Sequence, residues 1–469
     1  MTKIVMIGGG VCGLAGAMML ARDGHNVTVL ERDNGPVPQS AAGAWDEWSR
    51  EGVKQFRQPH YLQPGGWAVL KAALPDVGAA LEASGGTRFD ALCMMPPSIV
   101  DRAPRPGDER FVTTTARRPV LEHVLGQAAQ SEPGLEMRRG VVVEGLTTQW
   151  RDGEVHVTGV RLRSGQELAA DLVVDAMGRR SELPRWLCAA GAPPMHEEAA
   201  DSGFIYYSRF FRSSDGRLPA LRAPIFASFG TFGVVTLPGD SGTWSVTVPI
   251  SRGDQALKGL RHVRGWSSVV AACPLQAHWL EGEPITRVLA MGGVIDRYRR
   301  MVVDGRPVAT GIVPLADAWA CTNPSLGRGM SFGLRHAEML RDVVRTHVDQ
   351  PYDFAQRWDA VTEEQLTPWY RETVDENRDG LRQLEAARNG TNGQHADASP
   401  SALRAALLTA MPHDPDLFRM FLDSRCCITP LNEALASSAV VERVLEVAQG
   451  RGRVPLPGPS REQVLGLLN

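Results

Sequence analysis

The first residues of the chain contain glycines whose spacing could bind a dinucleotide. An apolar run over residues 3–7 leads directly into Gly8, Gly10 and Gly13, which stand in a G-x-G-x-x-G pattern. In such a pattern the first glycine permits a tight turn out of a strand. The second lets backbone amides approach a pyrophosphate, and the third lets a helix pack close to the sheet. The helix expected from about Leu14 to Ala21 presents free N–H groups and the positive end of its dipole to phosphate.

An acidic residue completes this pattern. A second strand is expected over residues 27–30, and it ends in Glu31. Strand, glycine turn, helix, strand and acid in this order form a dinucleotide-binding fingerprint, whereas the glycines alone could be a merely structural turn. Glu31 can accept hydrogen bonds from both hydroxyls of an adenosine ribose, which favours a ribose without a phosphate. The fingerprint does not separate NAD from FAD.

Three later segments bear on the choice of dinucleotide. Arg118 opens an amphipathic helix with an R-x-x-L-x-x-x-L pattern, and a buried strand farther along breaks at a small-residue turn that contains Gly178. Asp317 follows another strand, and its two acceptor oxygens can hold a sugar-like polyol. A glycine-rich loop over residues 324–330 then leads into a helix expected over residues 331–344.

With these segments in this order, the chain resembles the FAD-dependent aromatic hydroxylase and epoxidase superfamily, the single-component (group A) flavoprotein monooxygenases. The resemblance runs along the whole chain, and its most specific parts are the first glycine pattern and the A-D-A…P-x-x-G-x-G segment. It implies that Asp317 binds the ribityl chain of FAD, that Arg118 lies beside the cofactor, and that Glu31 binds the adenosine ribose.

The resemblance also places the loop over residues 324–329 against the isoalloxazine ring. Gly327 and Gly329 allow the backbone to touch the ring. A helix that starts near Gly329 and Met330 directs its positive end at the negative charge of reduced flavin. The candidate cofactor-binding residues are Gly8, Gly10, Val11, Cys12, Gly13, Glu31, Arg32, Arg57, Arg118, Gly178, Asp317, Pro324, Gly327, Gly329 and Met330.

The segment over residues 52–60 is similar to the G-V-x-Q…H-x-H segment of bacterial polyene epoxidases, with Gln58 in place of the first histidine. Arg57 could neutralise phosphate charge there. His60 could hydrogen-bond the flavin or a peroxide, which makes it the candidate catalytic residue. The alternatives are a solvated arginine and a histidine that caps the next helix.

The resemblance implies an activity as well as a cofactor. It implies an FAD-dependent monooxygenase that uses NAD(P)H as a transient reductant and O2, through a C4a-(hydro)peroxyflavin, to epoxidise or hydroxylate an apolar small molecule in bacterial specialised metabolism. The Ala176-Met177-Gly178 turn differs from the Asp-Gly pair of many hydroxylases. This difference keeps open an FAD-dependent reductase or dehydrogenase of an isoprenoid-like or other apolar substrate, without oxygen insertion. A flavin-free protein that kept the fold is a further alternative.

The expected fold class is α/β, with a discontinuous Rossmann-type FAD-binding domain over residues 1–185 and 298–345. Residues 186–297 are expected to form an inserted β-sheet domain that binds substrate, since they contain strand patterns over residues such as 225–235 and a turn near Pro238–Gly242. Residues 346–469 are expected to be helical, with a linker near 389–400. On the inserted sheet the candidate substrate-binding residues are Tyr206, Tyr207 and Arg209, whose alternative role is packing on a sheet face.

Composition narrows the remaining possibilities. The 469 residues carry a net charge of −3, which gives no electrostatic reason to expect nucleic acid or an anionic membrane as partner. The seven cysteines are scattered without metal-binding spacing, so no metal site is expected and a reducing cytoplasm is the expected compartment. An uncharged run over residues 4–21 superficially resembles a membrane span, but its five glycines argue against one. The oligomeric state stays open.

Overall fold

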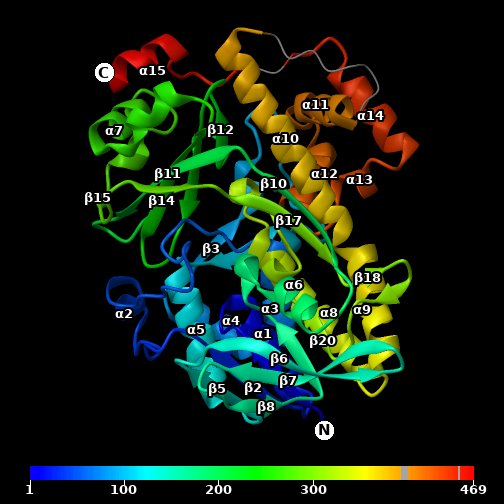
Figure 1. Ribbon diagram of the computed structural model, residues 1–469. Helices are drawn as coiled ribbons and strands as arrows, with labels where there is room; N and C mark the ends of the chain where they lie inside the picture. Colours follow the sequence, from blue (N-terminus) through cyan, green and yellow to red (C-terminus); the bar gives the residue numbers. More distant parts are fainter. Residues whose placement is uncertain (392–399, 453–454) are drawn as a thin grey trace.

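A parallel sheet built from distant parts of the chain carries the glycine turn (Figure 1). The structure is a computed structural model that describes residues 1–391, 400–452 and 455–469, so most of the expected linker near 389–400 lies outside the described residues. The sheet has the order β20-β9-β1-β2-β5, and all its pairings are parallel. Its strands are β1 (Lys3–Ile7), β2 (Asn26–Glu31), β5 (Leu135–Arg139), β9 (Leu172–Asp175) and β20 (Ile312–Pro314). Parallel strands end at one common edge, where α/β proteins bind ligands.

Two helices begin at that edge and pack against each other. Helix α1 (Val11–Arg22) connects β1 to β2, and α8 (Gly329–His347) follows β20. The helix expected over residues 331–344 therefore starts two residues earlier, at the glycine loop itself. A Cβ atom at Gly16 would stand 3.4 Å from the Cβ of Ala337, so the glycine lets the two helices approach closely. Their buried faces, which include Leu14 and Leu334, form the main core together with Met6 of β1.

A second, antiparallel sheet lies above the parallel one in Figure 1. Its strand order is β12-β13-β14-β11-β15, with β16 also paired to β11. The strands are β11 (Phe204–Arg212), β12 (Phe226–Ser228), β13 (Gly233–Pro238), β14 (Thr243–Ser251), β15 (Glu283–Pro284) and β16 (Leu289–Gly292).

The prediction of one strand over residues 225–235 is wrong. These residues form two paired strands, β12 and β13, with Phe226 opposite Val235. The chain reverses at Gly230, whose φ of +78° suits glycine and disfavours other residues. The expected turn between β13 and β14 is confirmed, and its Asp240 accepts hydrogen bonds from the Arg117 backbone N–H at 2.9 Å and from its side chain. This contact links the antiparallel sheet to the start of α5 (Arg118–Ser131).

The C-terminal part of the described chain is helical, as expected. Helix α10 runs alongside the antiparallel sheet toward α11, α12 and α14, while α15 returns to pack on α7 at the outer face of that sheet (Figure 1). These helices are α7 (Val263–Ala271), α9 (Pro351–Gln365), α10 (Thr367–Asn389), α11 (Pro400–Ala410), α12 (Pro415–Arg425), α13 (Leu431–Ala434), α14 (Ser438–Ala448) and α15 (Arg461–Leu468).

Smaller elements join these parts. The remaining helices are α2 (Ala41–Asp46), α3 (Pro64–Ala73), α4 (Pro75–Ala83) and α6 (Leu183–Ala189). The remaining strands are β3 (Thr87–Asp90), β4 (Val112–Thr115), β6 (Val143–Arg151), β7 (Glu154–Leu162), β8 (Glu167–Ala169), β10 (His196–Asp201), β17 (Ile295–Arg300), β18 (Val302–Val303), β19 (Arg306–Pro307) and β21 (Ala320–Cys321). Across the three described stretches of the chain, no helix combines the length and apolarity needed to cross a membrane.

Candidate active site

One large cavity connects the glycine turn of β1 to the antiparallel sheet and α10. Its volume is about 2270 Å³, more than twice the upper end of the range typical for small-molecule sites. The cavity therefore has room for a dinucleotide and a second molecule. Among its lining residues are these sequence candidates: Gly8, Gly10, Val11, Cys12, Gly13, Glu31, Arg32, His60, Arg118, Gly178, Tyr206, Asp317, Pro324, Gly327, Gly329 and Met330.

The three glycines of the first pattern differ in what they do. Gly8 has a φ of +111°, which only glycine adopts readily. A Cβ atom at Gly13 would collide with the carbonyl oxygen of Gly8, so this glycine is needed for the packing of α1 itself. A Cβ atom at Gly10 would meet no atom of the described chain within 4 Å. The fold thus requires the outer two glycines, while the middle one leaves open space at the start of α1.

Glu31 belongs to a buried ionic cluster that the sequence did not reveal. Its Oε2 atom accepts hydrogen bonds from the Gly9 N–H at 2.9 Å and from Arg50 at 2.5 Å. Arg50 also contacts Asp33 at 2.9 Å and Glu122 at 2.5 Å. One guanidinium therefore bridges three carboxylates. Arg50 stands outside the glycine fingerprint, so only its burial in the fold identifies it as part of the site.

The cluster continues through Arg118 to His60. Arg118 donates to Glu122 Oε1 at 2.6 Å and to His60 Nε2 at 3.1 Å. The other ring nitrogen of His60 lies 2.8 Å from the Gln58 carbonyl oxygen, to which it donates. Burial, and to a smaller extent the charge of Arg118, lower the pKa of His60 to about 3. His60 is therefore a neutral imidazole at physiological pH, and both of its nitrogens have partners.

Asp317 lies beside two glycines from separate parts of the chain, Gly178 and Gly329. A Cβ atom at Gly329 would stand 4.0 Å from Asp317 Oδ1, and one at Gly178 would stand 3.8 Å from the Asp317 Cβ atom. Burial raises the pKa of the Asp317 carboxyl, while Arg118 and Arg179 act in the opposite sense. The carboxylate accepts no hydrogen bond from the described residues, yet it lines the cavity. It is a partly buried acceptor that lines the space where a polyol could bind.

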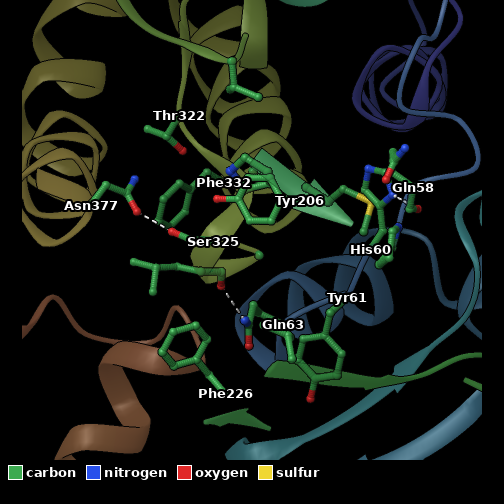
Figure 2. Close-up of a pocket in the computed structure, with 18 of the residues that line it drawn as sticks. Gln58, His60, Tyr61, Gln63, Tyr206, Phe226, Thr322, Ser325, Phe332 and Asn377 are labelled. Atoms are coloured by element: carbon green, nitrogen blue, oxygen red, sulfur yellow. Dashed lines mark hydrogen bonds between the residues drawn. The ribbon is translucent and has the colours of Figure 1, made fainter. Parts of the chain in front are cut away.

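The loop over residues 324–329 is fixed from two sides (Figure 2). From the α3 side, the Gln63 side chain donates to the Leu326 carbonyl oxygen at 3.0 Å. From α10, Asn377 accepts a hydrogen bond from the Ser325 hydroxyl. The buried Arg328 is bound to side chains of α10 and α12, namely Thr373 at 2.9 Å, Ser424 at 3.1 Å and Glu372 at 3.3 Å. Neither motif nor spacing in the sequence marks Gln63, Arg328 or Asn377.

Two of the three expected substrate-binding residues face away from the cavity, which corrects that prediction. Side chains alternate along a strand, so Tyr206 and Ser208 line the cavity while Tyr207 packs in the outer core. Arg209 also points outward, where its guanidinium lies 3.2 Å from Ser267 and 5.5 Å from the centre of the Trp266 ring.

Tyr206 keeps its place in the cavity wall. Its hydroxyl donates to the side-chain oxygen of Asn323 at 2.7 Å. Burial raises the pKa of Tyr206, so it stays protonated.

Arg57 does not line the cavity either, so the structure does not place it at a phosphate. Its guanidinium donates to the carbonyl oxygens of Trp45 and Trp48. It also lies over the Trp45 ring, 5.3 Å from the ring centre. Stacking and two backbone acceptors thus occupy a side chain that the sequence assigned to the cofactor.

The chain is similar in sequence or fold to several known proteins. Protein Rv3254 of Mycobacterium tuberculosis is 28% identical over 355 residues, which cover 73% of this chain and 72% of that protein. The FAD-dependent monooxygenase fsr3 of Gibberella fujikuroi is 25% identical over 216 residues, 44% of this chain and 36% of that protein. Among solved structures, PqsL of Pseudomonas aeruginosa, described as a probable FAD-dependent monooxygenase, has a TM-score of 0.57 at 18% identity and covers 83% of this chain and 99% of its own. No family model matches the chain.

The solved structures identify the fold of the chain. The chain has the fold of the FAD-dependent monooxygenases, which confirms at the level of the fold the resemblance drawn from the sequence.

Proposed function

We propose that this chain binds FAD and acts as a monooxygenase on an apolar small molecule. The observation that carries the proposal is the convergence on one cavity of the open space at Gly10, the free carboxylate of Asp317 and the start of α8 at Gly329. Their residues come from opposite ends of the FAD-binding part of the chain. A single elongated ligand that carries a pyrophosphate, a polyol and a ring fits all three.

Each of these groups has a place along FAD. The start of α1 at Gly10 would hold the pyrophosphate, because a helix N-terminus attracts anions. Glu31 would bind the adenosine ribose, and Asp317 would bind the ribityl chain. Bound there, FAD would supply redox chemistry with NAD(P)H and O2 that protein side chains lack. The start of α8 would then stabilise negative charge on the ring.

The protein groups around the ring are suited to positioning and shielding. Tyr206 is protonated and already donates its proton. His60, whose pKa is lowered to about 3, is uncharged near neutral pH. Neither is therefore a general base, and the role of the protein is to orient the substrate and exclude water. In place of the expected catalytic role, His60 would have a structural one, that of holding Arg118.

We also propose the division of labour along the chain. Residues 1–185 and 298–345 would form the FAD-binding domain, because they supply the strands of the parallel sheet. Residues 186–297 would form the substrate-binding domain, whose sheet forms the wall of the cavity at Tyr206 and Phe226. Epoxidation and hydroxylation both remain compatible with this apolar wall.

The first test is the cofactor itself. We expect the purified protein to be yellow and to release FAD on denaturation, and we expect Asp317→Ala to lose most of it. Unchanged flavin content in Asp317→Ala, or a colourless wild-type protein that binds no added FAD, would contradict the proposal.

A second measurement separates oxygenation from the reductase alternative. The flavin is reduced anaerobically with NADH or NADPH and mixed with O2 in a stopped-flow spectrometer. A monooxygenase should show a transient absorbance distinct from both oxidised and reduced flavin, whereas a reductase should return directly to the oxidised spectrum.

A further inference from the structure

The far side of the cavity contains a buried amide with one unpaired atom. Asn377 of α10 is 4% exposed and lines the cavity. Its Oδ1 atom accepts the hydroxyl proton of Ser325, and Figure 2 shows the two side chains directed at each other. Its Nδ2 atom has no hydrogen-bond partner among the residues that the structure describes. A donor removed from water without an acceptor is costly, so an acceptor on a bound molecule would stabilise it.

The Asn377 donor lies beside the loop proposed to contact the flavin ring. Ser325, its partner, lies in the loop over residues 324–329. The same loop contains Gly327 and Gly329, and Gly329 adjoins Asp317. An oxygen bound to Asn377 Nδ2 would therefore hold the rest of its molecule beside the part of the cavity assigned above to the flavin ring.

The acidic residues that flank Asn377 are already paired with arginines. Glu376 and Asp379 flank it on α10. Glu376 is paired with Arg425 at 2.7 Å, and Asp379 is paired with Arg404 at 3.3 Å. Asp379 also contacts Arg382, and Glu376 lies 3.6 Å from Arg328. These arginines are therefore already bound to carboxylates of the chain. The neutral amide thus favours an uncharged acceptor oxygen.

The surroundings of the amide are apolar and aromatic. Phe332 and Tyr206 lie near Asn377 and Ser325 in the close-up, and Phe226 lies on the facing strand wall (Figure 2). The helical side of the cavity adds the apolar side chains of Leu384 and Leu408. Flat rings fit such a site, because aromatic side chains stack on them.

We propose that Asn377 determines substrate specificity by donating a hydrogen bond to a carbonyl oxygen of an uncharged, multi-ring substrate. The inference rests on the proposed function, since it places the carbon skeleton beside the flavin site. It adds a residue outside both glycine motifs and a chemical class for the molecule that enters the cavity.

The test compares two tricyclic probes that differ in one oxygen. 9-Fluorenone has a carbonyl group and fluorene has none, while both are flat and uncharged. Their dissociation constants are measured by equilibrium dialysis against the flavin-loaded protein. The quantity of interest is the ratio of the fluorene constant to the fluorenone constant, because the ratio between variants cancels the different solubilities of the probes. Loss of one hydrogen bond should lower this ratio by roughly tenfold.

Substitutions at Asn377 test whether its Nδ2 atom causes the preference for fluorenone. We expect Asn377→Leu, which has a similar volume, to lower the ratio roughly tenfold. We expect Asn377→Asp, which keeps an acceptor toward Ser325 but loses the donor, to lower it at least as much. Gln383→Leu is the matched control, because it removes an exposed amide from the same helix and the same cavity, and it should leave the ratio unchanged. An unchanged ratio in Asn377→Leu, or no binding of either probe to the wild type, would overturn the inference.

Flavin absorbance, recorded on every sample, separates this inference from the proposed function. If the wild-type protein binds no flavin, the proposed function fails, and the same dialysis on the flavin-free protein still tests Asn377. If the flavin is retained and the ratio does not move, only the assignment of Asn377 fails.

Discussion

At the scale of single residues, the site depends on buried charges that sequence motifs do not contain. Arg50 is surrounded by Glu31, Asp33 and Glu122, and its side chain is almost completely buried. Burying an ion pair is costly, but removing one member is costlier, since it leaves the others buried without a counter-ion. Arg50 thus fixes the carboxylate proposed to bind the ribose and also holds Glu122 in place for Arg118.

Replacing Arg50 should therefore damage both stability and cofactor binding. We expect Arg50→Gln to lower the free energy of unfolding by about 3 to 5 kcal/mol and to weaken FAD retention. Arg22→Gln is the control, because Arg22 forms ion pairs with Asp76 and Glu132 that are partly exposed, and its loss should cost no more than about 1 kcal/mol. Chemical denaturation monitored by circular dichroism measures both. An equal loss of unfolding free energy in the two variants would show that the Arg50 cluster contributes no more to stability than a partly exposed ion pair.

Asp175, at the end of β9, should make stability depend on pH. It accepts hydrogen bonds from the Met177 N–H at 3.0 Å and from the Ser181 hydroxyl, yet burial raises its pKa to about 6. Between its ordinary pKa near 3.8 and 6, the folded protein binds more protons than the unfolded chain. Stability from this group is therefore full below pH 3.8 and is lost as the pH rises through 6.

Asp175→Asn should remove that dependence. The amide can keep an acceptor for Met177 and stays neutral, so we expect the variant to be more stable than wild type at pH 8, by on the order of 2 kcal/mol. The difference should shrink toward pH 4. Thermal melts across this range measure it. A variant less stable than wild type at pH 8 would mean that the ionised carboxylate of Asp175 stabilises the folded protein.

At the scale of elements, the glycine turn separates folding from binding. Gly13 allows α1 to pack against the turn, whereas Gly10 has a φ of −85° and a ψ of −178°, a conformation open to any residue. We expect Gly10→Ala to fold with wild-type stability in the absence of flavin but to bind FAD at least about tenfold more weakly, because its methyl group would occupy the space at the helix start. Gly13→Ala should fold poorly. Titration of flavin-free protein with FAD measures the first effect, and full FAD binding by Gly10→Ala would contradict the placement of the pyrophosphate.

The elements also show what could be read from the sequence. The unit from β1 to Glu31 was predictable because its signals are local: an apolar run, glycines at fixed spacing and an acid at the end of the next strand. The helix after the loop over residues 324–330 was predictable for the same reason, although it begins at Gly329. Both segments reach one cavity, as the resemblance implied, because β20 joins the sheet beside β9.

Other features depend on contacts that no local pattern encodes. Which face of β11 meets the cavity depends on its packing against α7, so Tyr206 lines the cavity while Tyr207 and Arg209 face away from it. Arg57 and Arg50 are both arginines near the same segment, and only tertiary contacts decide that Arg50 enters the ionic cluster. The site of Asn377 requires α10 to pass the loop at Ser325, which lies 52 residues away in the sequence.

At the scale of the whole molecule, the cavity lies between two sheets that have separate cores. The parallel sheet is packed by α1 and α8, whereas the outer face of the antiparallel sheet is packed by α7 and α15. Trp266 of α7 and Val464 of α15 both belong to the second core. The proposed cofactor site draws mainly on the first core and the substrate wall on the second, so the two functions could be damaged separately.

Val464→Asp should reveal this separation. Val464 is fully buried, and an unpaired carboxylate there should cost more than about 3 kcal/mol. Leu467→Asp, on the same helix but 37% exposed, should change stability by no more than about 0.5 kcal/mol. Because a chain with several cores need not unfold in one step, we expect Val464→Asp to lower the melting transition seen by tryptophan fluorescence by roughly 6 °C or more. Flavin release, followed by flavin fluorescence, should stay near the wild-type temperature. If both transitions fall together in Val464→Asp, the two sheets unfold as one unit, and the substrate wall cannot loosen without loss of the cofactor.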